Sequence, residues 1–211
     1  MVKDKSNLLN EIASYYKRKL AVYGDTPKGV DWNGEEGQTI RFKQLCKVIL
    51  HEERDFFTIN DLGCGYGALL DYMKDYYHNF KYFGADICSQ MIDTAKNRHL
   101  LNSSSEFINT EKLHHLSDYS LASGIFNVRH ERTDKEWVSY LHNTLNILHE
   151  NCSHGFAFNC LTLYSEKEKM RDNLYYADPC ELFDFCKKNY SKQVALLHDY
   201  GLYEFTIIVR K

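Results

Sequence analysis

The 211-residue sequence has little proline and no long apolar run. Only 2 prolines and 11 glycines occur, too few for a long disordered linker. No stretch of about 18 consecutive apolar residues is present, and residues 1–20 lack the apolar core of a signal peptide. We therefore expect a soluble, cytoplasmic protein with no membrane partner. The formal net charge of −3 argues against a broad basic surface for nucleic acid.

Cysteine and histidine patterns typical of metal sites are also absent. The 7 cysteines form no CxxC pair and their number is odd, which favours reduced, buried thiols over a disulfide framework. Two histidine pairs, 114–115 and 149–154, lack the i, i+4 spacing of zinc ligands on a helix, and no HExxH motif occurs. We therefore predict no metal site.

Apolar runs and amphipathic segments alternate from residue 56 onward. They predict strands over 56–62, 81–87, 105–110, 119–127, 155–162, 193–199 and 203–211, and helices over 67–77, 89–100, 111–116, 135–150 and 180–190. This alternation indicates a mostly parallel α/β sheet of seven strands. The last two strands are too close in sequence for a crossover helix, so we expect an antiparallel hairpin there. Two further helical patterns, at 6–21 and 35–51, precede the sheet.

The stretch INDLGCGYGALL follows the first predicted strand and opens the next helix. Its glycines, Gly63, Gly65 and Gly67, are two positions apart, whereas the dinucleotide fingerprint G-x-G-x-x-G places the third glycine three positions after the second. A Walker A loop would end in Gly-Lys-Ser/Thr, which is absent. A site for the phosphates of ATP or GTP is therefore excluded. The strict dinucleotide pattern is not met, although its looser form, which ends in glycine or alanine, would accept Ala68.

Two aspartates lie at the ends of the first two predicted strands. Asp61 precedes Gly63 by two positions, and Asp86 lies near the C-terminal end of the segment YFGADI, 19 positions after Gly67. An acidic residue at the second position can accept hydrogen bonds from both ribose hydroxyls of a bound nucleoside. The alternative is that both aspartates are turn residues.

These motifs resemble those of class I S-adenosylmethionine-dependent methyltransferases of the small bacterial type. DLGCGYG at 61–67 resembles the family's glycine loop, GADICSQMIDTAKNR at 84–98 its ribose-binding motif, and the terminal hairpin its antiparallel last strand. The resemblance implies a Rossmann-like, seven-stranded, mostly parallel sheet in the order 3-2-1-4-5-7-6, with helices on both faces. Residues 39–211 would form this methyltransferase domain, and residues 1–38 an N-terminal helical or lid segment.

The resemblance also implies a cofactor, S-adenosylmethionine, with S-adenosylhomocysteine as the product. By position, Asp61 would hold its ammonium, Asp86 its ribose and Ile87 its adenine. The remaining residues that the resemblance assigns to the cofactor are Gly63, Cys64, Gly65, Asn109, Ser123, Gly124 and Phe126. Core packing is the alternative for Phe126.

Residues for the methyl acceptor are expected in the segments that open over the same edge of the sheet. His130 is a candidate general base, and Tyr164 a second candidate catalytic residue. The candidate acceptor-binding residues are Trp32, Arg41, Tyr175 and Tyr176. The alternatives are a solvent-exposed loop for His130, and a glycine-rich turn followed by a helix for residues 23–45. Asp178 is the expected N-cap of the helix that begins near Pro179.

The leading prediction is a methyltransferase that methylates an oxygen or nitrogen of a small molecule. One alternative is an NAD(P)-dependent oxidoreductase, which the short glycine spacing and the lack of a suitably placed Tyr-x-x-x-Lys pair disfavour. The other is a non-catalytic module that binds S-adenosylmethionine or a nucleotide. The oligomeric state does not follow from the sequence.

Overall fold

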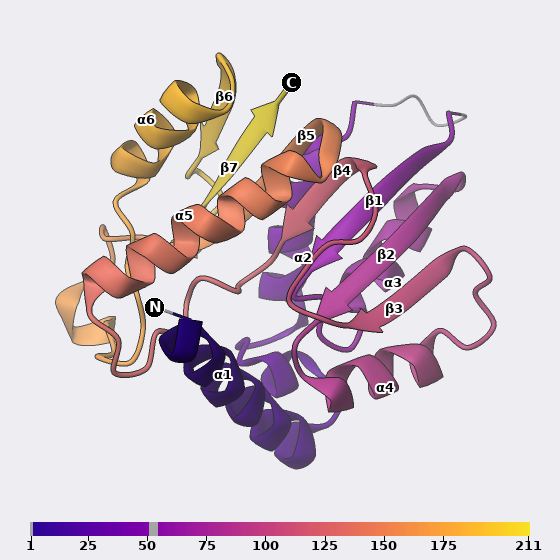
Figure 1. The fold of residues 1–211 in the computed structure, drawn as a ribbon, viewed down its shortest axis with the longest axis horizontal. Helices are drawn as coiled ribbons and strands as arrows, with labels where there is room; N and C mark the ends of the chain where they lie inside the picture. Colours follow the sequence, from indigo (N-terminus) through magenta and orange to yellow (C-terminus); the bar gives the residue numbers. More distant parts are fainter. Residues whose placement is uncertain (1, 51–54) are drawn as a thin grey trace.

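A computed structural model describes residues 2–50 and 55–211 and contains one seven-stranded sheet (Figure 1). The strand order is β3-β2-β1-β4-β5-β7-β6, which confirms the predicted order. The strands are β1 (Phe57–Leu62), β2 (Phe80–Asp86), β3 (Ser105–Asn109), β4 (Ser117–Ala122), β5 (Cys152–Leu161), β6 (Gln193–Leu197) and β7 (Glu204–Arg210).

One strand runs against all the others. β7 pairs antiparallel with both β5 and β6, whereas β1 to β5 pair in parallel. This confirms the predicted terminal hairpin. Because successive side chains of a strand point to opposite faces, β7 sends Phe205, Ile207 and Val209 to one side and Ile208 to the other.

The helices precede the sheet or lie between its strands. They are α1 (Val2–Tyr23), α2 (Glu35–Leu45), α3 (Ala68–Tyr76), α4 (Ser89–Arg98), α5 (Asp134–Glu150) and α6 (Pro179–Asn189), with short 3-10 helices η1 (Pro27–Val30), η2 (Cys46–Val48) and η3 (Lys167–Lys169). Asp178 accepts hydrogen bonds from the N–H groups of Cys180 and Glu181, so its predicted role as the N-cap of α6 is confirmed. Within the described residues, no helix has both the length and the apolar character needed to span a bilayer.

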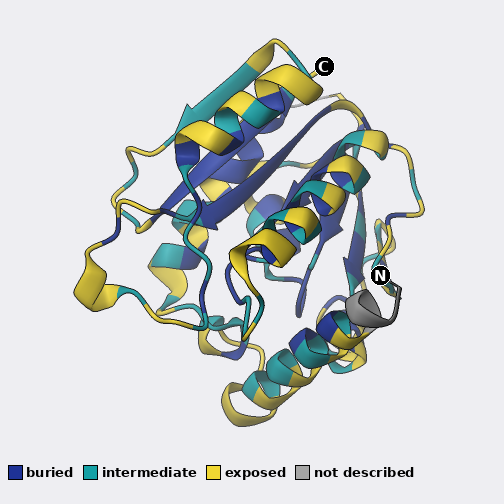
Figure 2. Ribbon diagram, turned by 60° about the vertical axis from the view of Figure 1, so that its left-hand side comes forward, coloured by how far each residue is buried: buried dark blue, intermediate teal, exposed yellow. Residues whose placement is uncertain are grey.

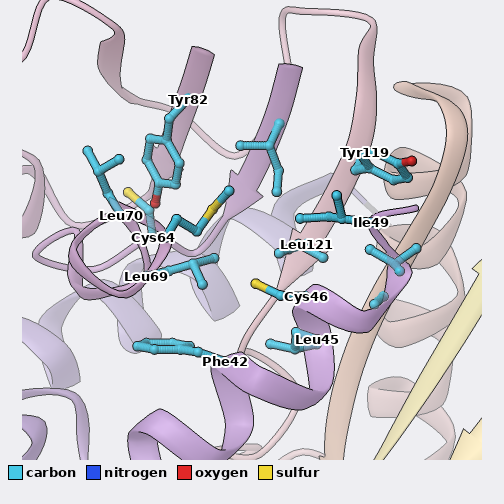
Figure 3. Close-up of a cluster of buried hydrophobic side chains, with 14 of the residues drawn as sticks. Phe42, Leu45, Cys46, Ile49, Cys64, Leu69, Leu70, Tyr82, Tyr119 and Leu121 are labelled. Atoms are coloured by element: carbon cyan, nitrogen blue, oxygen red, sulfur yellow. The ribbon is translucent and has the colours of Figure 1, made fainter. Parts of the chain in front are cut away.

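Helices cover both faces of the sheet, and the strands between them are largely buried (Figure 2). On one face, α2 and α3 bring Phe42, Leu45 and Leu69 onto β1 and β4, as the close-up in Figure 3 shows. On the other face, α5 and α6 contribute Leu145 and Leu182 to a second apolar cluster. This two-sided cover fixes the sheet and leaves the carboxyl ends of the parallel strands available for a site.

The structure corrects one predicted helix and two predicted boundaries. The predicted helix over 111–116 is absent, because the hydroxyl of Thr110 accepts the N–H of Lys112 and holds a turn there. The fourth strand ends at Ala122 rather than residue 127, so residues 123–127 belong to a loop. The helix predicted over 35–51 ends as α2 at Leu45, followed by η2; residue 51 itself lies outside the described residues.

Helix α1 lies across the end of the sheet to which the arrows of β1, β2 and β3 point (Figure 1). Its neighbour η1 is attached to it through Asp31, whose carboxylate accepts 2.6 Å hydrogen bonds from Tyr15 and Lys19. Near its middle, α1 is also tied to the loop before α5, where Arg132 pairs with Glu11. The helix therefore forms a roof over the carboxyl ends of the strands.

Candidate active site

A cavity of about 930 Å³ lies beneath α1 at the carboxyl ends of β1, β2 and β4. Ligand pockets of small-molecule enzymes commonly measure about 300–1,000 Å³. The sheet side of the wall includes the loop after β1, the ends of β2 and β3 and the loop after β4, and residues of η1 and of all the α-helices except α6 contribute to the wall as well. Asp61, Asp86 and Trp32 all line it, so residues from three distant segments meet there.

The glycine loop takes a backbone shape that side chains would not permit. Gly63, Gly65 and Gly67 have φ values of 79°, 54° and 84°, in the left-handed region that favours glycine. A Cβ built on Gly63 would lie 2.2 Å from the side chain of Ile125. The loop therefore passes close to the segment after β4, and the two together form the floor of the cavity.

Four backbone N–H groups of this loop, those of Gly63, Cys64, Gly65 and Gly67, already have acceptors. Those of Gly63 and Cys64 donate to the carbonyl of Ala85, at 2.7 and 3.1 Å. Gly67 N donates to the carbonyl of Cys64, and Gly65 N donates to Asp86. Phosphate-binding loops instead point free N–H groups at the anion. These four N–H groups therefore offer no free donor to a phosphate.

The carboxylate of Asp86 is fixed by the loops on either side of it. Its two oxygens accept the N–H groups of Gly65 at 2.9 Å and Cys88 at 2.8 Å. Burial raises the pKa of Asp86 above its usual value, and these donated hydrogen bonds counteract the rise. A carboxylate has about four acceptor positions, so Asp86 keeps free lone pairs for hydroxyl groups of a ligand.

Asp61 carries a buried acceptor that no described residue satisfies. Its Oδ2 accepts a hydrogen bond from the hydroxyl of Tyr82, but its Oδ1 has no partner within the described residues. Burial raises the pKa of Asp61 to about 7, the hydrogen bond from Tyr82 lowers it, and the charge of Asp86 raises it further. An unpaired buried carboxylate oxygen is costly, and a cation in the cavity would relieve that cost.

Trp32 lines the same cavity as these carboxylates. A Cβ built on Gly124 would lie 2.4 Å from the Trp32 ring, so the indole packs directly on the backbone of Gly124. The guanidinium of Arg41 lies 3.7 Å from the Trp32 ring centroid on another side, and Gln38 and Tyr66 are hydrogen-bonded nearby. The indole is therefore held by contacts from both α2 and the loop after β4.

The structure brings most of the predicted cofactor residues into this cavity. Those that line it are Asp61, Gly63, Cys64, Gly65, Asp86, Ile87, Asn109, Ser123 and Gly124, together with the predicted acceptor residue Trp32. Phe126 does not line it. Its ring is fully buried in the apolar cluster beneath α5, and its carbonyl accepts the indole N–H of Trp137. Phe126 therefore packs in the core, which was the alternative interpretation of this residue.

The three remaining predicted acceptor residues do not line the cavity. Arg41 is paired with Glu204, and Tyr175 packs in the cluster around Trp137. Tyr176 accepts the N–H of Arg171 in the loop after β5. The structure gives these three side chains structural contacts instead of access to a bound acceptor.

His130 and Tyr164, the two predicted catalytic residues, also lie away from the cavity. The imidazole of His130 packs edge-on against Tyr15, and its pKa is lowered mainly by burial. Tyr164 is 68% exposed, beside His198. The structure therefore supports a catalytic role for neither.

Residues from α1 and α5 complete the wall, and the sequence patterns did not single them out. Leu8, Ile12 and Tyr16 come from α1, and Tyr140 and Asn143 from α5. Their helical spacing predicts a buried face, but periodicity does not distinguish a face that packs on the core from one that lines a cavity. The described residues hold no cluster of three or more His, Cys, Asp and Glu side chains placed to bind a metal ion.

Known proteins share both the sequence and the fold. Residues 59–151 match the methyltransferase domain family. The "Putative methyltransferase Rv1506c" of Mycobacterium tuberculosis is 55% identical over 157 residues, which cover 74% of this chain and 95% of that protein. Among solved structures, magnesium protoporphyrin IX methyltransferase from Synechocystis PCC 6803 with bound SAH has a TM-score of 0.68 at 12% identity, covering 99% of both chains.

Two further solved structures share the fold at lower similarity. The DhpI–SAH complex has a TM-score of 0.64 at 12% identity and covers 95% of both chains. The small RNA methyltransferase HEN1 has a TM-score of 0.59 at 15% identity and covers 82% of this chain and 26% of that one. The sheet order and the cavity at the carboxyl ends of its strands are those of the class I methyltransferase fold. With 55% identity to a relative covered almost end to end, the chain belongs to the S-adenosylmethionine-dependent methyltransferase family.

Proposed function

We propose that this chain transfers a methyl group from S-adenosylmethionine to an oxygen or nitrogen of a small-molecule acceptor. The observation that carries the proposal is the unpaired Oδ1 of Asp61, which is buried at a cavity wall. It is the acceptor that the ammonium of the cofactor's methionine part requires. The saturated N–H groups of the adjacent loop fit a cofactor without phosphate.

Each part of the cofactor has a matching group in the wall. Asp61 would accept from the ammonium, Asp86 from the ribose hydroxyls, and Ile87 would pack on the adenine, with Asn109 beside it. Asn109 is itself held, because its Nδ2 donates to the carbonyl of Asp86 at 2.8 Å. The bound cofactor supplies an electrophilic methyl group on a sulfonium. Ser123 would lie at the same end of the cavity as Asp61.

The protein's contribution would be alignment and exclusion of water. The roof formed by α1 and the indole of Trp32 enclose the space above the floor, and holding two reactants in line can lower a barrier by about 7–11 kcal/mol. No histidine among the described residues lines the cavity. The proposal therefore favours an acceptor atom that arrives with an available lone pair, without a histidine base.

A small acceptor fits this enclosure better than a nucleic acid. The cavity lies under a helix and is bounded on several sides by side chains, and the chain's net charge is −3. Nucleic-acid enzymes need cationic groups along the backbone of their substrate. The fold alone does not decide this point, because HEN1, an RNA methyltransferase, shares it.

The two alternative functions have less support. An NAD(P)-dependent enzyme would place a pyrophosphate on the glycine loop, where the N–H groups of Gly63, Cys64, Gly65 and Gly67 are already engaged. Tyr15 and Lys19 are four positions apart, but both are bound to Asp31 and neither lines the cavity. A non-catalytic module would bind the cofactor in the same way, so it differs from the leading proposal only in turnover.

Isothermal titration calorimetry with S-adenosylmethionine, S-adenosylhomocysteine and NAD tests the proposal. We expect both adenosyl compounds to bind and NAD not to bind. Asp86→Ala should weaken their binding by ~1–3 kcal/mol, the scale of lost charge-assisted hydrogen bonds. Asp93→Ala, on the exposed side of α4, is the matched control and should bind as the unchanged protein does.

The outcomes separate the three functions. Binding of NAD without binding of S-adenosylmethionine would refute the proposal. Binding of both adenosyl compounds, with no methyl mass gain on any member of a metabolite panel, would favour the non-catalytic module. An unchanged affinity in Asp86→Ala would show that the ribose lies elsewhere.

A further inference from the structure

A chain of buried polar contacts begins at Arg41 and ends at the backbone of Gly124. Arg41 donates from Nε and Nη2 to the two carboxylate oxygens of Glu204, at 2.8 and 2.9 Å. Glu204 also accepts from Asn159 Nδ2 at 2.9 Å. The Oδ1 of Asn159 then accepts the N–H of Gly124 at 2.7 Å. Glu204 is 1% exposed and Asn159 is fully buried, so the contacts are shielded from water.

Both ends of this chain contact Trp32. Arg41 stacks on the indole ring, with Cζ 3.7 Å from its centroid, and the ring packs on the backbone of Gly124. The contacts therefore form a closed circuit through Trp32, Arg41, Glu204, Asn159 and Gly124. We call these five residues the indole circuit. They come from the loop after η1, from α2, β7 and β5, and from the loop after β4.

A contact circuit of this kind contributes more to geometry than to stability. Removing two charges from water costs several kcal/mol per ion, and the pairing only partly offsets that cost. The bidentate fork of an arginine, in contrast, fixes both distance and plane. Trp32 itself lies in an irregular segment between η1 and α2. The stacking of Arg41 is therefore what sets the plane of an indole that regular backbone structure does not fix.

We propose that Arg41, Glu204 and Asn159 are positioning residues that hold the Trp32 indole against Gly124 at the methyl-transfer end of the cavity. This inference rests on the proposed function, because the methyl group would lie beside the segment 123–125 that Trp32 covers. None of the three residues lines the cavity, so they act through the indole. The plane of the Trp32 indole, which these three residues fix, then sets the direction from which the acceptor approaches the methyl group.

The chain contains only 2 tryptophans, so fluorine NMR of protein labelled with 5-fluorotryptophan gives one signal from each. A Trp32→Phe variant assigns the signals. Trp137 is an internal control, because it is fully buried in a separate cluster beneath α1. The test variants are Glu204→Gln, which removes the charge and keeps the size, and Arg41→Lys, which keeps the charge but loses the fork and the stacking.

We expect the Trp32 signal to shift or broaden in both variants while the Trp137 signal stays in place. In the unchanged protein, the Trp32 signal should differ between the complexes with S-adenosylmethionine and S-adenosylhomocysteine, since the two differ only by the methyl group and its charge. That difference should shrink in both variants, while affinity for S-adenosylhomocysteine changes by less than about threefold. Asp184→Asn, which removes a charge that pairs with Lys188 on α6, should leave both signals unchanged.

Two results would overturn the inference. The first is an unchanged Trp32 signal in both variants. The second is an equal change of the Trp32 and Trp137 signals, which would mean general loosening of the fold. If Glu204→Gln does not fold, the double variant Arg41→Gln/Glu204→Gln is measured in its place, because it removes both buried charges. Failure of both adenosyl compounds to bind would refute the proposed function instead, and the signals of the ligand-free protein would still test the indole circuit.

Discussion

Replacing Asp61 by asparagine is the sharpest test of the cofactor site. The exchange keeps the shape of the side chain and removes its charge. Burial raises the pKa of Asp61 from 3.8 to about 7, so below pH 7 the ligand-free protein holds a proton on this carboxyl group. An ammonium placed beside Oδ1 favours the charged form and lowers that pKa. Cofactor binding at pH 6 should therefore release close to one proton.

The size of the effect follows from the pKa shift. One pKa unit corresponds to about 1.36 kcal/mol, so the rise to about 7 makes an ionised Asp61 cost about 4 kcal/mol in the ligand-free fold. The folded state keeps a proton that the unfolded state has lost, so stability falls as pH rises from about 4 to 7. Asp61→Asn removes this fall in stability with pH, because the asparagine side chain does not ionise. We expect the variant to be more stable than the unchanged protein at pH 8 and to bind the cofactor more weakly.

Calorimetry with S-adenosylhomocysteine at pH 6, in two buffers of different ionisation enthalpy, measures the released protons. Urea unfolding at pH 5 and pH 8 measures the stability difference. Asp93→Asn, at an exposed position on α4, is the control for the loss of one carboxylate. The reasoning fails if the unchanged protein releases no proton on binding, or if Asp61→Asn releases as many as the unchanged protein does.

Three further variants test separate parts of the description. Gly124→Ala should drive a methyl group into the ring of Trp32 at a backbone φ of 75°, lowering stability by ~1–3 kcal/mol; thermal unfolding at an unchanged temperature would contradict the packing. Thr133→Ala should cost ~1 kcal/mol in urea unfolding, because Thr133 and Glu136 form a capping box at the start of α5; no loss would mean that the cap is not formed in solution. Tyr164→Phe should leave the affinity for S-adenosylmethionine unchanged, because its hydroxyl lies off the cavity wall, and weaker binding would place it at the site after all.

Local patterns were sufficient for the sheet and for the cofactor side of the cavity. The seven strands and the terminal hairpin follow from apolar periodicity and short spacing, and the resemblance of the glycine loop and of the Asp86 motif to the methyltransferase family implied the strand order and the meeting of Asp61 with Asp86. The missing helix at 111–116 shows the limit of the same method. There the hydroxyl of Thr110 competed with the helix for backbone hydrogen bonds.

The acceptor side depends on contacts between distant residues. Arg41 and Glu204 are 163 positions apart, and nothing local to Arg41 shows that its guanidinium turns away from the cavity. Tyr175 likewise reads as an accessible aromatic side chain in sequence but packs in the cluster around Trp137. Patterns identify which residue types are present in a segment, whereas their partners follow only from the folded chain.

The engaged N–H groups of the glycine loop have a consequence for competition inside a cell. ATP and other adenine nucleotides share the adenosine part of the cofactor and are far more abundant. At this loop a polyphosphate would find no free N–H donor from Gly63, Cys64, Gly65 or Gly67, and would approach the carboxylates of Asp61 and Asp86. The same loop that accommodates the methionine part would therefore disfavour the phosphates of the commonest adenosine-bearing competitors.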